Sequence, residues 1–384
     1  MEIYFDNSAT TRCYDEVRDI VVKTMTADYG NPSAMHRKGV EAEEYVKEAA
    51  RRIARILKVD PKEILFTSGG TESDNMAVIQ TAMALKRSGN HVITTKVEHP
   101  AVREPVSYLE KQGFEVTYLP VDEHGVVKQQ ALQEALRPDT ILVSIMQVNN
   151  ETGAVMPVEE YGSLIKRLSP GAVFHVDAIQ SFGKFPIYPR RSKIDLLSVS
   201  SHKIHGPKGV GFLYIRSGVK ILPLILGGGQ QNGMRSGTDN VPGIAGMGLA
   251  AEMVYQNLEE NVRHLRELRK YMIEGLAGIE GVHVNGMPFP EGAPHIISAT
   301  FDGIRSEVLL HALEDRGVYI SAGSACSSHK RKPSATLSAM GLSREQIEST
   351  VRISFSEENT LQEAEQALGI LREQVSVLRR YARH

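Results

Sequence analysis

Cysteine is scarce in this chain: only Cys13 and Cys326 occur among its 384 residues, and they form no CxxC spacing. This excludes a disulfide framework and a cysteine-based zinc site, and it indicates a cytosolic compartment. The 13 histidines include no HExxH motif, and His202 and His205 lack a third partner in the sequence. We therefore expect no metal site.

Neither sign of charge is in excess, and long hydrophobic runs are missing. The 44 basic and 46 acidic residues give a net charge of −2, which argues against nucleic acid or an anionic membrane as a direct partner. The longest apolar run, near 221–226, is broken by Pro223 and is too short to cross a bilayer. Residues 1–6 contain acidic side chains, whereas the start of a signal peptide contains basic ones. We expect a soluble, cytoplasmic protein.

Short β-rich runs alternate with helical patterns from about residue 63 onward. Such alternation is typical of βαβ units and predicts an α/β fold with a mostly parallel, seven-stranded sheet flanked by helices. The strand candidates are 64–67, 91–95, 115–119, 141–145, 172–176, 196–200 and 211–215. Helices are expected at 37–57, 72–87, 101–112, 129–136 and 158–168.

The pattern changes after Pro242, where one long helix is predicted over 243–277. Shorter strands and helices follow, in the style of an α+β domain. These strands are expected at 282–284, 296–301 and 351–355, and the helices near 305–315, at 343–349 and from about 360. We expect a large domain over residues 14–257 and a smaller domain formed by residues 1–13 and 258–384.

Two residues with complementary chemistry follow strand candidates. Lys203 comes just after the run 196–200, and Asp177 closes the run 172–176. Ligands bind beyond the carboxyl ends of the strands in an open parallel sheet, so both side chains can face one site. A lysine can form an imine with an aldehyde cofactor, and a carboxylate can hold a pyridinium nitrogen protonated. Alone, however, a lysine at a strand end is more often a surface charge.

Two further loops follow strand candidates at the same edge of the sheet. The segment 68–73, SGGTES, opens a helix, and its free backbone N–H groups suit a single phosphate. It lacks the lysine of a P-loop, and such a turn is most often only a turn. His99 follows the run 91–95, where an imidazole can stack on a flat ring or relay a proton. A lone loop histidine is more often incidental.

Two residues of the second domain are candidates for substrate chemistry. Cys326 lies in the small, polar segment 323–328, and the basic residues 329–332 that follow favour its thiolate form. From the residues alone, Cys326 is equally well interpreted as a nucleophile or as an exposed cysteine without a role. Arg352 lies in an alternating strand, where it can clamp a carboxylate or simply face solvent. We interpret Cys13 as structural.

Taken together, these residues give the chain a resemblance to the NifS/IscS-type cysteine desulfurases, which are class V, fold-type I pyridoxal 5′-phosphate (PLP) enzymes. The resemblance covers essentially the whole length, and the order and spacing of its motifs are specific. The matching segments are 4–11, 30–33 with His36, 67–73, 148–151, 175–181, 200–203 with 206–209, 227–231 with 235–238, and 323–327. Departures from the usual family pattern are Gly70, Ser8, Arg12 and His205, and none of them changes a side chain with a proposed chemical role.

The resemblance implies a role for each candidate residue. Lys203 binds the cofactor covalently, Asp177 pairs with the pyridine nitrogen, Gln180 contacts the ring hydroxyl and His99 stacks over the ring. Cys326 accepts the sulfur. The phosphate is expected to contact Gly70, Thr71, Ser200 and His202, with Thr238 reaching in from a second subunit of a homodimer, and the substrate carboxylate is expected to contact Asn150 and Arg352.

The implied activity is PLP-dependent removal of sulfur from L-cysteine, giving L-alanine and a persulfide on Cys326. The sulfur is expected to pass to an iron–sulfur cluster scaffold or another acceptor protein. Selenocysteine lyase and class V aminotransferase are the alternative enzymes. A sulfur carrier or scaffold component, in which the cofactor only stabilises the fold, is the alternative of a different class.

Overall fold

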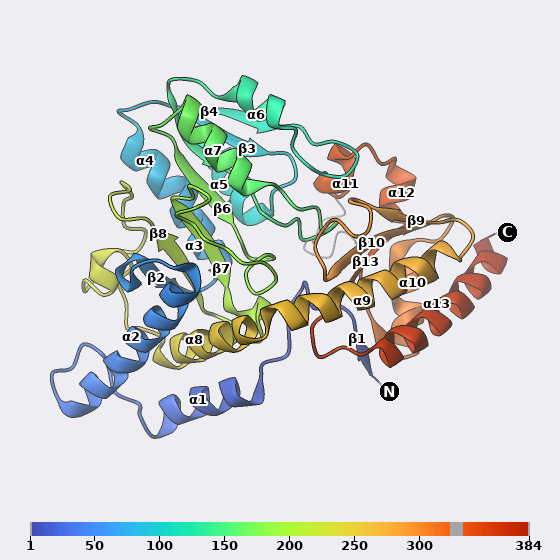
Figure 1. The fold of residues 1–384 in the computed structure, drawn as a ribbon, viewed down its shortest axis with the longest axis horizontal. Coiled ribbons are helices and arrows are strands. Elements are labelled where there is room, and N and C mark those ends of the chain that lie inside the picture. Colours follow the sequence, from blue (N-terminus) through green and yellow to red (C-terminus); the bar gives the residue numbers. More distant parts are fainter. Residues whose placement is uncertain (1, 323–332, 383–384) are drawn as a thin grey trace.

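The computed structural model describes residues 2–322 and 333–382 (Figure 1). Its largest element is a seven-stranded sheet with the strand order β2-β8-β7-β6-β5-β3-β4. The strands are β2 (Ile64–Thr67), β3 (His91–Thr95), β4 (Glu115–Leu119), β5 (Thr140–Ser144), β6 (Val173–Asp177), β7 (Leu196–Ser200) and β8 (Gly211–Ile215). Only β8 runs antiparallel to its neighbours. This confirms the predicted fold class, with β5 and β6 displaced by one residue from the predicted runs.

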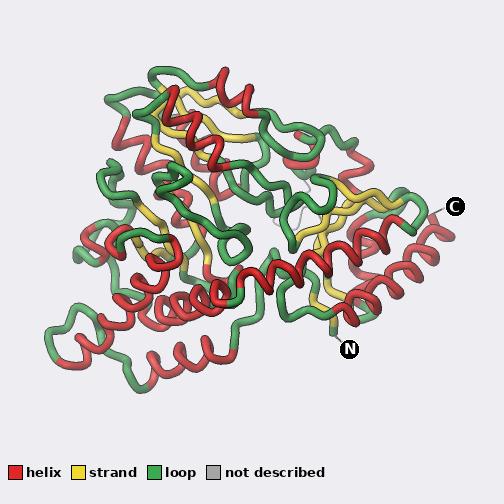
Figure 2. The backbone as a smooth tube through the Cα atoms, viewed as in Figure 1, coloured by secondary structure: helices red, strands yellow, loops and turns green. Residues whose placement is uncertain are grey.

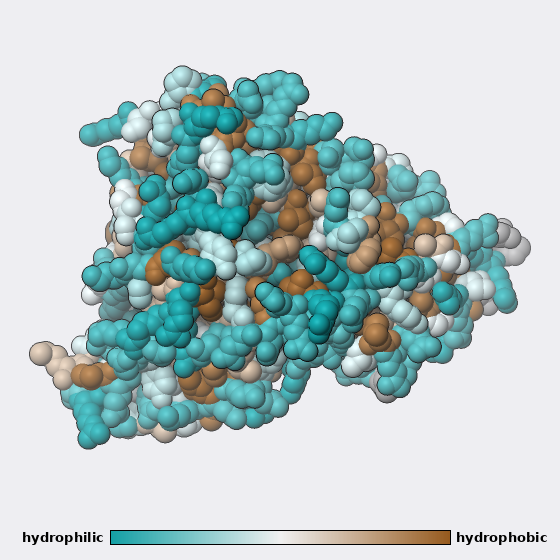
Figure 3. Space-filling model, viewed as in Figure 1, coloured by the Kyte–Doolittle hydropathy of each residue, from teal (hydrophilic) through white to brown (hydrophobic). Residues whose placement is uncertain are grey.

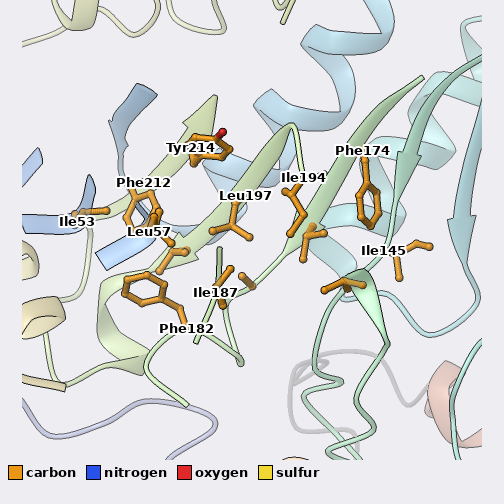
Figure 4. Packing of buried hydrophobic residues seen from close by; sticks show 14 of the residues in the cluster. Ile53, Leu57, Ile145, Phe174, Phe182, Ile187, Ile194, Leu197, Phe212 and Tyr214 are labelled. Atoms are coloured by element: carbon orange, nitrogen blue, oxygen red, sulfur yellow. The ribbon is translucent and has the colours of Figure 1, made fainter. Parts of the chain in front are cut away.

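Helices cover both faces of this sheet because its strands carry apolar side chains on both sides. One face packs against α2 (Arg37–Leu57), α7 (Val158–Leu168) and α8 (Val241–Gln256). Figure 4 shows Phe174, Leu197 and Phe212 of three adjacent strands on this face, together with Ile53 and Leu57 of α2. Burial of such large apolar groups is the main favourable term in folding.

The opposite face packs against the helical stretch that follows β2 and against α5. The stretch consists of α3 (Gly70–Asn75), a π-helical turn (Met76–Gln80) and α4 (Thr81–Leu85), and α5 spans Pro100–Lys111. The stretch from α3 to α4 covers most of the helix predicted over 72–87 and begins two residues before it. Helices α1 (Asp15–Thr26) and α6 (Gln129–Ala135) lie further out.

A second, four-stranded antiparallel sheet has the order β12-β13-β10-β9 and its own hydrophobic cluster. Its strands are β9 (Val282–Asn285), β10 (Ile296–Phe301), β12 (Ser321–Ala322) and β13 (Thr350–Ser354). The remaining elements are the strand pair β1 (Ile3–Tyr4) and β11 (Val318–Tyr319) and the helices α9 (Leu258–Ala277), α10 (Ser306–Glu314), α11 (Ala335–Ala339), α12 (Arg344–Glu348) and α13 (Leu361–Ala382). Irregular segments gather between the two sheets (Figure 2).

The single helix predicted over 243–277 is wrong, because α8 ends at Gln256 and α9 begins at Leu258. Between them Asn257 has non-helical angles, with φ −116° and ψ 23°. The two helices serve different cores: α8 packs in the cluster of the large sheet, and α9 packs in the cluster of the small sheet. A break lets each helix turn its apolar side toward its own sheet.

The surface is mostly polar, with hydrophobic side chains scattered over the visible face (Figure 3). None of the helices within the described ranges is long and apolar enough to cross a membrane.

Candidate active site

A pocket of about 260 Å³ opens beside the carboxyl ends of β3, β6 and β7. It brings together ten of the sequence-predicted site residues from distant parts of the chain. Its lining consists of Ser8, Ala9, Gly70, Thr71, His99, Ala101, Met146, Asn150, Asp177, Ile179, Gln180, Ser200, His202, Lys203 and Arg352. The parallel arrangement of β3, β6 and β7 explains the convergence, because parallel strands end at one edge of the sheet.

Lys203 ends the short 3₁₀ helix (Ser201–Lys203) that follows β7. Its partly buried ammonium donates hydrogen bonds to the backbone carbonyls of Ser8 at 2.5 Å and Ala9 at 2.7 Å. The N-terminal segment therefore forms one wall of the pocket. Sequence reasoning did not assign Ser8 or Ala9 a place in the site, although the segment 4–11 was one of the matching motifs.

Asp177 is the last residue of β6 and is buried. One of its oxygens accepts a hydrogen bond from the Ile179 backbone N–H at 2.9 Å. Burial raises the pKa of Asp177, while the ammonium of Lys203 acts in the opposite direction. A cation bound in the pocket would favour the ionised carboxylate, since opposite charges stabilise each other in a low-dielectric site.

His99 caps the N-terminus of α5, and its Nδ1 accepts a hydrogen bond from the Ala101 backbone N–H at 3.1 Å. In a neutral imidazole the proton is therefore on Nε2. Burial, assisted by the charges of Lys203 and Arg103, lowers the pKa of His99 to about 4. The ring is uncharged at neutral pH and lines the pocket.

The start of α3 and the end of β7 supply hydrogen-bond donors at another side of the pocket. Gly70 and Thr71 lie in the first turn of α3, where backbone N–H groups have no partner within the helix. Ser200 ends β7, and His202 follows it with Nδ1 at 3.3 Å from the Thr10 hydroxyl. Burial lowers the pKa of His202 to about 4. These groups together suit one phosphate.

Arg352 reaches the pocket from β13 of the small sheet and is almost completely buried. Its Nη1 donates to the backbone carbonyl of Asn150 at 2.8 Å, and its Nη2 pairs with Asp6 at 2.8 Å. Its Nε has no hydrogen-bond partner within the described part of the chain. Arg352 lines the pocket and is shielded from bulk solvent, which favours the carboxylate-binding interpretation.

Two predicted site residues are not in the pocket lining. Thr238 is exposed and lies outside the pocket. Cys326 lies outside the described residues. Asp6 was missed by sequence reasoning, because its partner Arg352 is 346 positions away in the chain. No cluster of three or more metal-ligating side chains occurs within residues 2–322 and 333–382.

The fold and the pocket define a class of protein, the PLP proteins of fold-type I, in which the cofactor lies at the strand ends of such a sheet. Comparison with known proteins gives the family. The aminotransferase class-V family matches residues 3–367, and the chain belongs to this family. Its members depend on PLP.

Curated relatives and solved structures agree with this placement. The chain is 44% identical over 377 residues to "Cysteine desulfurase IscS" of Methanosarcina thermophila, covering 98% of this chain and 93% of the relative. A solved "NifS-like protein" superposes with a TM-score of 0.93 at 40% identity, covering 98% of this chain and 100% of that one. The structure titled "SspA in complex with cysteine" gives a TM-score of 0.81 at 34% identity, with 94% and 100% coverage.

Proposed function

We propose that this chain is a PLP-dependent cysteine desulfurase, which converts L-cysteine to L-alanine and leaves a persulfide on Cys326. The observation that carries the proposal is the convergence of the Lys203 ammonium, the Asp177 carboxylate and the Arg352 guanidinium on one pocket. This convergence occurs in a chain that is 44% identical to a protein named cysteine desulfurase.

The residues of the pocket fit the cofactor. A cationic ring nitrogen would neutralise the buried Asp177 carboxylate, and the uncharged ring of His99 suits stacking on a flat heterocycle. Gly70, Thr71, Ser200 and His202 would hold the phosphate, and Gln180 would meet the ring hydroxyl. Lys203 would hold the cofactor covalently. When bound, the cofactor takes up the electron pair released at the substrate's α-carbon.

The chain's own groups carry the remaining chemistry. The carboxylate of L-cysteine binds Arg352 and Asn150, which orients the α-carbon toward Lys203. Lys203 Nζ takes the α-proton. The thiolate of Cys326 attacks the sulfur of the substrate, so that an S–S bond forms and the C–S bond breaks. The electron pair of the broken bond stays with the carbon fragment, which gains a proton at Cβ. The proton held by Lys203 returns to the α-carbon, and the product is alanine.

The domain division, dimerisation and sulfur delivery belong to the same proposal. The two sheets with separate hydrophobic clusters, and the break between α8 and α9 at Asn257, support a division at residue 257. The exposure of Thr238 supports its role in the pocket of a second copy in a homodimer. Delivery of the sulfur to an iron–sulfur scaffold or another acceptor protein and the cytoplasmic location rest on the sequence alone.

The test is an absorbance spectrum of the purified protein before and after addition of L-cysteine, together with analysis of the products. We expect a visible band that changes on addition, and alanine formed in step with sulfide when a reductant is present. Mercaptopyruvate in place of alanine, with the amine passed to the cofactor, would instead identify an aminotransferase. A protein that binds the cofactor at full occupancy and forms no alanine would contradict the proposal.

Matched variants separate the two proposed chemical residues. Lys203→Ala should abolish alanine formation, because it removes both the covalent attachment and the base. Cys326→Ser should abolish persulfide formation while the cofactor band still responds to L-cysteine. Cys13→Ser is the control and should retain parental activity. Parental sulfide release by Cys326→Ser would show that Cys326 is not the acceptor.

A further inference from the structure

Gln180 lines the pocket, and the orientation of its amide group follows from its neighbours. Its Nε2 donates a hydrogen bond to the Ser8 backbone carbonyl at 3.0 Å. A carbonyl oxygen only accepts hydrogen bonds, so the nitrogen and not the oxygen of the amide must face Ser8. The Gln180 Oε1 then lies 3.4 Å from Nε2 of His295, a residue outside the pocket lining.

The same geometry fixes the tautomer of His295. An imidazole nitrogen that faces an amide oxygen must carry the hydrogen, because two acceptors do not bond to each other. The other nitrogen, Nδ1, is buried and has no hydrogen-bond partner among the described residues. A proton on Nδ1 would leave that N–H unpaired and would also set Nε2 against the Gln180 oxygen as two acceptors, whereas a proton on Nε2 leaves only the Nδ1 lone pair unpaired. Both observations place the proton of His295 on Nε2.

The surroundings of His295 keep its ring uncharged and in place. Burial and the nearby cations Lys184, Arg352 and Arg269 lower the pKa of His295, against the opposing effect of Glu357. Its backbone carbonyl accepts a hydrogen bond from the Phe355 N–H at 2.9 Å, next to β13. The side chain is 3% exposed. His295 is therefore a fixed, neutral donor at the side of Gln180 that faces away from Ser8.

The Ser8 carbonyl on the other side of Gln180 is held by the same small sheet. The Ser8 backbone N–H donates to the Ser354 hydroxyl at 2.9 Å, and Ser354 belongs to β13. Ser8 also accepts the hydrogen bond from Lys203. The Gln180 amide is thus held at its oxygen by His295 and at its nitrogen by Ser8.

We propose that His295 is a positioning residue, which orients the Gln180 amide so that its second N–H is available to the cofactor's ring hydroxyl. The proposal rests on the proposed function, because it assigns the pocket to PLP. His295 contributes no group to the pocket itself and acts through Gln180. Through His295, the region of the small sheet thereby sets the orientation of the Gln180 amide at the edge of the large sheet.

The test compares His295→Met, which removes the donor at similar volume, with His295→Gln, which can keep an N–H near the position of Nε2. Both are made in the full chain and purified with PLP. We expect His295→Met to release PLP roughly 10-fold faster on dialysis, as expected for the loss of one buried hydrogen bond. The absorption maximum should shift in the same direction as in Gln180→Leu, and His295→Gln should restore both values.

A double variant separates positioning from a purely structural role. In the Gln180→Leu background, His295→Met should add nothing further to PLP release, because its effect acts through the amide. Equal effects in both backgrounds, or a His295→Gln variant as impaired as His295→Met, would overturn the proposal. NMR of ¹⁵N-histidine-labelled holoenzyme should show a neutral His295 protonated at Nε2, and protonation at Nδ1 would also overturn it.

These measurements need no turnover. A holoenzyme that binds PLP but forms no alanine would contradict the proposed function while the release rates still test His295. A chain that holds no PLP at all would contradict both the proposed function and the positioning role of His295. The tautomer of His295 would then still be confirmed or overturned by NMR.

Discussion

Arg352 and Asp6 form a nearly buried ion pair at the edge of the pocket. The Arg352 side chain is 6% exposed and that of Asp6 is 20% exposed. Removing one member of such a pair is costly, because the remaining charge loses its partner in a low-dielectric site. Asp6 keeps the guanidinium at a fixed place while Asn150 holds its other terminal nitrogen. The residue that we propose to bind the substrate carboxylate thus depends on a residue outside the pocket lining.

We predict that Asp6→Asn raises the KM for L-cysteine roughly 10-fold with a smaller change in kcat. The reason is that the variant loses the charge-assisted hydrogen bond that orients Arg352. Steady-state kinetics of alanine formation measure it. Glu358→Gln is the control: Glu358 pairs with the exposed Arg12, and such surface pairs contribute little. An unchanged KM in Asp6→Asn would contradict the positioning role of Asp6.

The place of single residues in the pocket was predictable where they follow a strand. Lys203, Asp177 and His99 were found because each comes just after a β-rich run, and parallel strands share one edge. Asp6 and Ser8 gave no such signal. The contacts of Asp6 and Ser8 are with residues of other elements. Ser8 acts through its backbone carbonyl, which every residue type carries, so its identity gives no signal.

Among the elements, the first residue of β8 lies close to the backbone of β7 and of Gly69, the residue before α3. A Cβ built on Gly211, the first residue of β8, would lie 2.6 Å from the Val199 carbonyl oxygen and 2.7 Å from the Gly69 Cα. A Cβ on Gly70 would instead meet the Cδ1 of Ile179 at 2.2 Å. Backbone atoms cannot move aside without shifting a strand, whereas the end of an isoleucine side chain can rotate.

We therefore predict that Gly211→Ala lowers the free energy of unfolding by about 2 kcal/mol or more, as overpacking against backbone does. Gly70→Ala is the matched variant and should cost less than about 1 kcal/mol, since only the Ile179 side chain must move. Urea denaturation followed by circular dichroism measures both. Equal losses in the two variants would show that contact with backbone is not the deciding factor.

The elements themselves were largely predictable, and the exceptions have physical reasons. The runs 64–67 and 196–200 match β2 and β7 because buried strands carry continuous apolar residues bounded by polar ones. The break at Asn257 was not predicted, because helical spacing continues through it. It exists because α8 and α9 bury their apolar sides against different sheets.

Across the whole molecule, a buried layer of polar groups lies on the face of the large sheet that packs against α3. His175 contacts the hydroxyls of Ser144 at 2.8 Å and Ser198 at 2.9 Å, and its Nε2 is 3.5 Å from Asp74. His175 and Asp177 lie two residues apart on β6 and therefore on the same face. Burial lowers the pKa of His175 to about 3 and raises that of Asp74.

Within this layer His175 predicts a loss of stability in acid, whereas the raised pKa of Asp74 acts in the opposite direction, because burial favours the protonated carboxyl. An exposed histidine has an ordinary pKa of 6.5, whereas the pKa of His175 in the folded chain is about 3. Between these values the unfolded chain binds the proton and the folded chain does not. The contribution of His175 to stability should therefore fall as the pH falls from 6.5 toward 3, by about 1.4 kcal/mol per pH unit. Urea midpoints measured from about pH 7 to about pH 5 test the slope.

The variants for this test are His175→Gln and His311→Gln. His175→Gln should flatten the slope below pH 6.5, even if it lowers stability at every pH. His311 is exposed on α10, and its replacement should leave the slope as it is. A His175→Gln variant with the parental slope would mean that His175 does not remain neutral in the folded chain.

The sequence by itself determined the α/β class, most of the strands and helices, and the chemical types gathered at the strand ends. These features follow from the spacing of apolar and polar residues, because that spacing depends only on neighbouring positions in the sequence. Only the tertiary structure decided which groups are partners. His295 meets Gln180 across 115 positions and Asp6 meets Arg352 across 346, since packing of two sheets, and not adjacency in the chain, sets the neighbours, the protonation and the orientation of each buried polar group.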